Sequence, residues 1–149
     1  MEISVFIADD HVIMREALLE LLESRKNLHV VGQACNGKEA LEGVRRLKPD
    51  VVVMDICMPH LNGVEATRRL KEICPDTKVV GLSMHSQHKV LEAIIKAGAS
   101  GYVMKSEAFS ELEQAIRQVT KGEIYLSSNT SRILATEFAA KTRHPEQVH

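Results

Sequence analysis

Acidic, hydroxyl and amine side chains follow four of the short apolar runs in this 149-residue chain. Asp9 and Asp10 come after the first run, Asp55 after the third, Ser83 after the fourth and Lys105 after the fifth. Carboxylates at close range repel one another and raise each other's pKa, so a cluster of three requires a cation. Oxygen ligands without histidine or thiolate favour Mg²⁺, which leaves coordination positions for phosphate oxygens.

These residue types together suit a phosphoryl group. Lys105 adds a positive charge and Ser83 adds a hydroxyl donor, and with the metal they match the charge on the equatorial phosphoryl oxygens. One carboxylate then acts as the nucleophile and forms an aspartyl phosphate. Asp55 is the predicted nucleophile, because it lies at the centre of the expected sheet, between the acidic pair and the lysine.

Two alternating periodicities predict the elements that position these residues. Runs rich in β-branched residues predict strands, and each run is followed by a segment with helical spacing. The expected strands are Ile3–Ala8, Leu28–Ala34, Val51–Met54, Lys78–Leu82 and Gly101–Met104. The expected helices are Val12–Arg25, Lys38–Leu47, Gly63–Ile73, Lys89–Ala97 and Ser110–Lys121.

The strand–helix repeats predict an α/β protein with a parallel five-stranded sheet and helices on both faces. Val51–Met54 is apolar at every position, as a central strand buried on both faces requires. Right-handed crossovers limit the topology to a few doubly wound orders, and we expect the flavodoxin-like (βα)5 order 2-1-3-4-5. That order places a ligand site at the carboxyl ends of the first and third strands.

Apolar side chains at helical spacing predict which helix faces turn toward the sheet. The expected inward residues of the first helix are Ile13, Ala17, Leu18, Leu21 and Leu22. Those of the last helix are Phe109, Leu112, Ile116 and Val119. A sixth helix is expected over Ser127–Lys141, followed by a frayed tail over Thr142–His149.

The motifs around these residues resemble those of bacterial two-component response regulator receiver domains. The motifs are Asp9-Asp10-His11, Met54–Pro59 with Gly63, Leu82–His85 and Gly98–Lys105. The last two are most similar to the NarL/FixJ (LuxR-type) branch. The resemblance implies a receiver domain over residues 1–122 and a linker helix and tail over residues 123–149. The branch's DNA-binding helix-turn-helix domain would then lie outside this chain.

The resemblance also implies the metal ligands and the reaction. Asp55 would accept a phosphoryl group from a phosphohistidine on a sensor histidine kinase. Asp10, Asp55 and the backbone carbonyl of Cys57 would bind Mg²⁺ directly, and Asp9 would act through a metal-bound water. The protein would be a switch that catalyses only its own phosphorylation and dephosphorylation, not an enzyme with an external product.

The remaining implied roles concern the response to phosphorylation. Lys105 would pair with the phosphoryl oxygens, Ser83 would turn to hydrogen-bond to them, and Tyr102 would follow into the vacated space. The readout surface would be the fourth helix, fifth strand and fifth helix, residues 87–121. A homodimer is expected either through that surface or through the first and fifth helices. Met84 stands where many branches have a small residue, and we expect it to slow self-dephosphorylation.

Composition and missing motifs exclude other classes. With 19 Lys+Arg, 20 Asp+Glu and a net charge of -1, the chain has no general attraction for nucleic acid or anionic membrane. The three cysteines are scattered, and no secretory signal or membrane-length apolar run is present, so we expect a cytoplasmic protein. No phosphate-binding glycine motif follows a strand. Cys57 stands where a dehalogenase-type phosphatase needs a second aspartate, and His11 and His60 are predicted to lie at the rim of the site.

Overall fold

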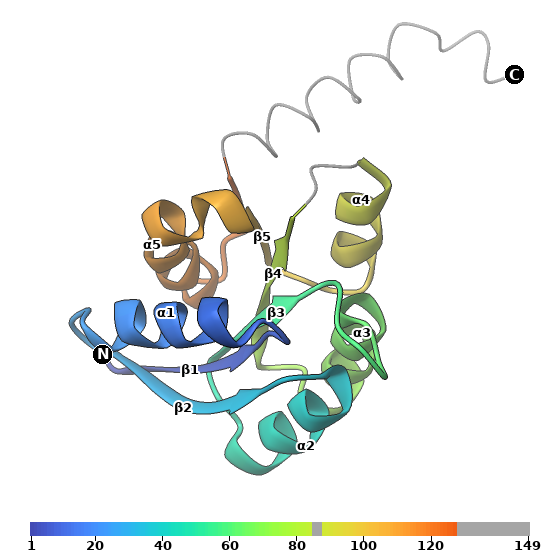
Figure 1. Ribbon diagram of the computed structural model, residues 1–149, viewed down its shortest axis with the longest axis horizontal. Helices are drawn as coiled ribbons and strands as arrows, with labels where there is room; N and C mark the ends of the chain where they lie inside the picture. The colour runs from blue at the N-terminus through green and yellow to red at the C-terminus, as the bar shows by residue number, and fades with distance from the viewer. Residues whose placement is uncertain (85–87, 128–149) are drawn as a thin grey trace, which may run out of the picture.

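The computed structural model describes residues 1–84 and 88–127, in which strands and helices alternate along the chain (Figure 1). The strands are β1 (Ile3–Ala8), β2 (Leu28–Ala34), β3 (Val51–Asp55), β4 (Lys78–Ser83), β5 (Gly101–Met104) and β6 (Tyr125–Leu126). The helices are α1 (Val12–Glu23), α2 (Gly37–Leu47), α3 (Gly63–Ile73), α4 (His88–Lys96) and α5 (Ala108–Thr120), with a 3-10 turn, η1 (Lys105–Glu107). Beyond residue 127, the expected sixth helix and tail lie outside the described residues.

The strands form one parallel sheet in the order β2-β1-β3-β4-β5-β6. The doubly wound flavodoxin-like order 2-1-3-4-5 is therefore confirmed, but the predicted number of five strands is wrong. The additional strand β6 pairs with Gly101 and Tyr102 of β5. Its two residues are too few to show an alternating pattern, so only the backbone pairing with β5 identifies it.

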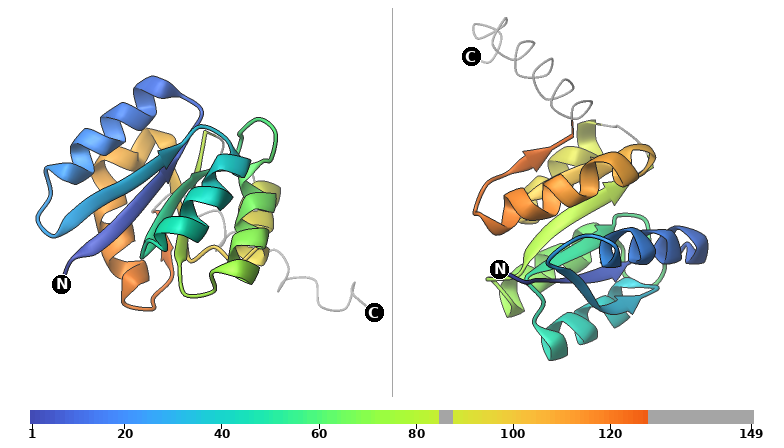
Figure 2. Two further views of the ribbon diagram at one scale, coloured as in Figure 1. Left: turned by 90° about the horizontal axis from the view of Figure 1, so that it is seen from below. Right: turned by 90° about the vertical axis from the view of Figure 1, so that its left-hand side faces the viewer.

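Helices cover both faces of this sheet, as predicted (Figure 2). α1 and α5 pack on one face, whereas α2, α3 and α4 pack on the other. Within β3, Val51 and Val53 belong to the first hydrophobic layer, and Val52 and Met54 belong to the second. All four side chains are fully buried, which explains the uninterrupted apolar sequence of this strand.

The predicted inward helix faces are confirmed at five positions, whereas Ala17 and Leu21 of α1 are only partly buried and Met14 and Leu19 pack against the core instead. Leu18 and Leu22 of α1 are fully buried, as are Leu112, Ile116 and Val119 of α5. Ile13 is 84% exposed and Phe109 is 51% exposed, so their expected burial is wrong. Both lie in the first turn of their helices, where a neighbouring residue packs against the core instead, Met14 in α1 and Ala108 in α5.

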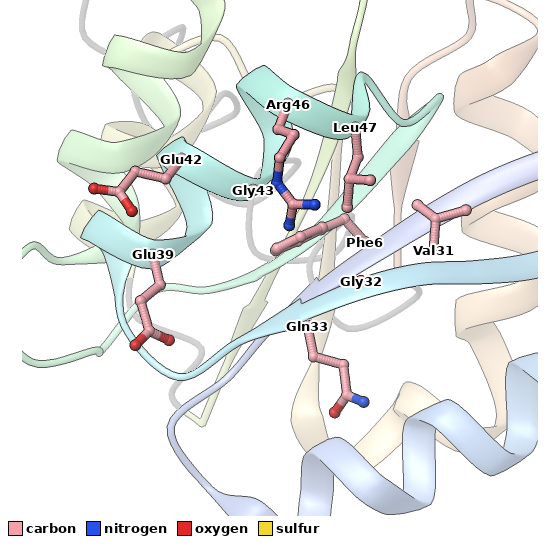
Figure 3. Close-up of a pocket in the computed structure, with 9 residues that line it drawn as sticks. All are labelled: Phe6, Val31, Gly32, Gln33, Glu39, Glu42, Gly43, Arg46 and Leu47. Atoms are coloured by element: carbon pink, nitrogen blue, oxygen red, sulfur yellow. The ribbon is translucent and has the colours of Figure 1, made fainter.

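A pocket of about 300 Å³ opens beside the edge strand β2, with the Phe6 ring at its base (Figure 3). A Cβ atom at Gly32 would lie 2.8 Å from this ring, and one at Gly43 would lie 2.6 Å from it. Glycine at both positions therefore leaves room for Phe6. Arg46 reaches from α2 toward the ring. None of the residues predicted to carry chemistry lines this pocket.

No helix within the described ranges has the length and apolar character needed to cross a bilayer.

Candidate functional site

The residues predicted to carry chemistry converge at the carboxyl edge of the sheet. Asp55 is the last residue of β3 and Ser83 is the last residue of β4. Asp9 directly follows β1, and Lys105 begins η1 directly after β5. Because parallel strands all end at the same edge, residues from four separate parts of the chain meet there.

Lys105 links the two buried carboxylates of this edge. Its Nζ atom lies 3.1 Å from Asp55 Oδ2 and 3.2 Å from Asp9 Oδ1. Asp9 is fully buried, Asp55 is 2% exposed and Lys105 is 6% exposed. One ammonium balances only one of the two buried negative charges, so the site retains a net attraction for a further cation.

Backbone groups hold the carboxylates in place. The His11 amide donates a 2.8 Å hydrogen bond to Asp9 Oδ1, and the Cys57 amide donates a 3.1 Å hydrogen bond to Asp55 Oδ1. At the start of α3, a Cβ atom on Gly63 would overlap the Asp55 carbonyl oxygen. Gly63 therefore allows α3 to approach the end of β3, which sets the position of Asp55.

The donor atoms at this edge fit a hard divalent cation. One ligand atom from each of Asp9, Asp10, His11 and Asp55 lies within 4.8 Å of the others. Asp10 Oδ1 is buried and has no hydrogen-bond partner in the part of the chain that the structure describes. A buried carboxylate oxygen without a donor is costly, and a cation beside it removes that cost. The carboxylate set suits Mg²⁺, as predicted from the residue types.

His11 lies at the rim of this group, as predicted, since its side chain is 58% exposed, but one ring nitrogen reaches the carboxylates. Its Nδ1 atom is 2.9 Å from Lys105 Nζ and 3.2 Å from Asp9 Oδ1. The sequence indicates that His11 lies near the carboxylates, because it directly follows the aspartate pair at the start of a helix. His60 is exposed and does not belong to the group.

Ser83 and Tyr102 form a second part of the site. Ser83 is 3% exposed and Tyr102 is 1% exposed, on neighbouring strands. Burial raises the pKa of the Tyr102 phenol, and a hydrogen bond with Ser83 lowers it. Tyr102 is thus already buried and bonded to Ser83 in this conformation. The movement of the two side chains on phosphorylation stays a prediction.

The pKa of Asp55 is raised from its ordinary value of 3.8 to about 7. Burial is the largest cause, and the neighbouring Asp9 carboxylate raises the pKa further. Lys105 and the Cys57 amide lower it and offset part of the rise. The native protein without a metal therefore holds a proton on Asp55 between about pH 4 and pH 7, where the unfolded chain does not.

Magnesium binding is expected to depend on pH through this carboxyl. Because Mg²⁺ competes with the proton, its apparent affinity should rise by up to about tenfold per pH unit below pH 7 and level off above it. Without the metal, stability should fall as pH rises from about 4 to 7, since the native state loses its extra proton. Calorimetric Mg²⁺ titrations from pH 5.5 to 8 test the first point, and urea unfolding tests the second. In an Asp55→Asn control the pH dependence of stability should largely disappear; its persistence would assign it to another group.

A doubly wound parallel sheet with an aspartate–lysine cluster at its carboxyl edge defines the receiver class of signalling domains. The family model described as the response regulator receiver domain matches residues 5–117. The chain belongs to this family.

Curated relatives and solved structures agree with this assignment. The chain is 40% identical over 144 residues to Response regulator GacA of Pseudomonas viridiflava, covering 97% of this chain and 65% of GacA. It is 36% identical over 133 residues to Response regulator UvrY of Escherichia coli, covering 89% of this chain and 61% of UvrY. A LuxR-family two-component response regulator from Aurantimonas superimposes with a TM-score of 0.89 and 34% identity, over 93% of this chain and 99% of that one.

These comparisons confirm the predicted family and its NarL/FixJ (LuxR-type) branch. The chain spans less than two thirds of the length of both curated relatives.

Proposed function

We propose that Asp55 accepts a phosphoryl group from the phosphohistidine of a sensor histidine kinase and that the resulting acyl phosphate switches the surface of the domain. The observation that carries this proposal is the buried Asp55 carboxylate with the Lys105 ammonium 3.1 Å from its Oδ2 atom. A buried carboxylate is not hydrated by bulk water, so its oxygen can act as a nucleophile. The ammonium beside it can pair with an oxygen of the incoming phosphoryl group.

In the transfer, an Asp55 oxygen forms the new bond to phosphorus. The bond between phosphorus and the imidazole nitrogen of the donor breaks, and the nitrogen keeps the electron pair. Lys105 pairs with the negative charge on the phosphoryl oxygens, and the Ser83 hydroxyl donates a hydrogen bond to one of them.

Mg²⁺ would be held by Asp10, Asp55 and the Cys57 carbonyl, with Asp9 acting through a water. The ion supplies positive charge that offsets the charge of the phosphoryl oxygens when it is bound. The unpartnered Asp10 Oδ1 atom and the close spacing of the donor atoms support this ligand set.

The output of the switch is proposed to be transcription, through a helix-turn-helix domain outside this chain. The described part of the readout surface is α4, β5 and α5. A homodimer is proposed through α1 and α5 or through that surface. The predicted boundary at residue 122 leaves out β6, which pairs with β5, so the receiver domain is proposed to span residues 1–127 and to be followed by the linker segment. The location is proposed to be the cytoplasm. The three cysteines are free, as a reducing compartment requires.

Acetyl phosphate, a small phosphoryl donor, tests the proposal without the kinase. With Mg²⁺, the intact protein should gain the mass of one phosphoryl group and lose it on treatment with hydroxylamine, which cleaves acyl phosphates. No gain should occur with EDTA. The proposal would be overturned if acetyl phosphate added no phosphoryl mass and the phosphoryl mimic beryllofluoride caused no change in conformation. Repeated turnover of an external phosphoester would identify a phosphatase instead.

Replacing Met84 by alanine is expected to shorten the lifetime of the acyl phosphate by about two- to tenfold, on the order of 0.4–1.4 kcal/mol of barrier. Met84 directly follows Ser83 and is 65% exposed, so its truncation should open the approach of water at little cost in stability. The decay of labelled protein after removal of acetyl phosphate measures the lifetime. An unchanged lifetime would show that Met84 does not limit the approach of water.

A further inference from the structure

The His11 side chain turns into the acidic cluster instead of capping its helix. His11 is the N-cap residue of α1, yet its side chain makes no capping hydrogen bond. Its Nδ1 atom lies 3.2 Å from Asp9 Oδ1, 3.5 Å from Asp10 Oδ1 and 3.9 Å from Asp55 Oδ2. One ring nitrogen therefore faces the carboxylates of all three aspartates.

The contact with Lys105 places His11 Nδ1 where the acids and the amine meet. Lys105 Nζ lies 2.9 Å from His11 Nδ1, and both groups face the carboxylates of Asp9 and Asp55. A neutral imidazole binds metal ions through a ring nitrogen, and Nδ1 is the ring nitrogen directed at the carboxylates.

The spacing of the donor atoms suits a shared ion. Two ligands on neighbouring corners of an octahedron lie about 3.0 Å apart when the bonds to the metal are about 2.1 Å. The distances from His11 Nδ1 to the oxygens of Asp10 and Asp55, the two proposed direct carboxylate ligands, are 3.5 and 3.9 Å, between this value and the roughly 4.2 Å that separates opposite corners. The Asp10 oxygen is also one of the buried atoms that have no hydrogen-bond partner among the described residues.

We propose that His11 is a metal-specificity residue, whose Nδ1 atom adds a nitrogen ligand to the carboxylate site and favours Co²⁺, Zn²⁺ and Mn²⁺ over Mg²⁺. Imidazole suits the first-row transition metals, whereas Mg²⁺ prefers oxygen ligands. This inference rests on the proposed function only in its choice of carboxylate ligands, and it does not require phosphoryl transfer. A transition-metal ion held by His11 would compete with Mg²⁺ for the same carboxylates.

The test compares Co²⁺ with Mg²⁺ in metal-free protein. Replacing His11 by alanine should weaken Co²⁺ binding by at least about tenfold, whereas Mg²⁺ binding should change by no more than about twofold. His11→Asn is a second variant, because asparagine is a favourable N-cap residue and keeps the start of α1. His29 on β2, whose side chain is also 58% exposed, is the matched control, and its replacement by alanine should leave both affinities unchanged.

A spectroscopic measurement reports the ligand itself. Mn²⁺ bound to the wild-type protein should show a directly bonded nitrogen coupling in pulsed electron paramagnetic resonance, and both His11 variants should lose it. Equal Co²⁺ affinity in wild type and in the folded variants, or no nitrogen coupling, would overturn the proposal.

Labelling of the same wild-type preparation with acetyl phosphate and Mg²⁺ tests the proposed function separately. If the protein is phosphorylated by acetyl phosphate but the His11 variants bind Co²⁺ as tightly as the wild type, this inference alone is refuted. If bound Mn²⁺ shows the nitrogen coupling but acetyl phosphate never phosphorylates the protein, the proposed function alone is refuted.

Discussion

The Asp55→Asn protein is expected to take up phosphoryl groups from acetyl phosphate and Mg²⁺ at least about a thousandfold more slowly than the wild type. The amide is nearly the same size as the carboxylate but lacks the negatively charged nucleophile. Asp55 is buried and already contacts Lys105, so no neighbouring group takes over its position without a rearrangement. Intact-mass spectrometry over time measures the uptake.

A second aspartate provides the control. Asp76 is exposed and directly precedes the start of β4, at the amino edge of the sheet and opposite the carboxyl edge that holds Asp55. The Asp76→Asn protein should therefore be phosphorylated like the wild type. Peptide mapping of the wild type should place the acyl phosphate on Asp55. If Asp55→Asn retained the label, the proposed acceptor would be wrong. A label that survived alkali but not acid would indicate a phosphohistidine, with His11 as the first residue to examine.

Replacing Lys105 by methionine is expected to destabilise the metal-free protein by about 3–5 kcal/mol. The substitution removes the ammonium that lies between the buried Asp9 and Asp55 carboxylates and leaves those charges without a counter-ion. Asp55→Asn should have the opposite effect and raise stability by about 1–2 kcal/mol, because it removes one of the two repelling charges. Urea unfolding in EDTA at pH 8 measures both changes.

Lys96 supplies the comparison for this stability prediction. Its side chain is 76% exposed and pairs with Glu92 on the surface of α4, so Lys96→Met should change stability by less than about 0.5 kcal/mol. Combining Lys105→Met with Asp55→Asn should recover much of the lost stability, because the two residues contact each other. Equal stability of Lys105→Met and Lys96→Met would show that Lys105 does not neutralise the buried acids.

The sequence predicted the strands and their order because both depend on strong local patterns. Val51–Met54 is apolar throughout and bounded by polar residues, and the structure extends this strand by only one residue, to Asp55. The convergence of Asp9, Asp55 and Lys105 followed from topology, since residues that end parallel strands must meet at one edge. Their individual roles in phosphoryl transfer came from the resemblance and stay predictions.

The missed features depend on information that a residue pattern does not contain. The position of His11 was predicted, but the direction of its side chain depends on a rotamer and on the neighbouring Lys105. Ile13 fits the apolar spacing of α1, yet it is exposed, and the neighbouring Met14 packs against the core instead. Strand β6 has two residues and forms only because β5 offers an unpaired edge.

The position of β6 determines where a minimal receiver fragment can be cut. The Tyr125 amide donates to the Ser100 carbonyl, the Ser127 amide donates to the Tyr102 carbonyl, and the Tyr125 hydroxyl donates to Glu111 of α5 at 2.6 Å. A fragment ending at residue 122 would lack all three bonds and would present the backbone of Tyr102 as an open sheet edge, where other chains can add. Expression of a well-behaved fragment therefore requires the chain through Ser127.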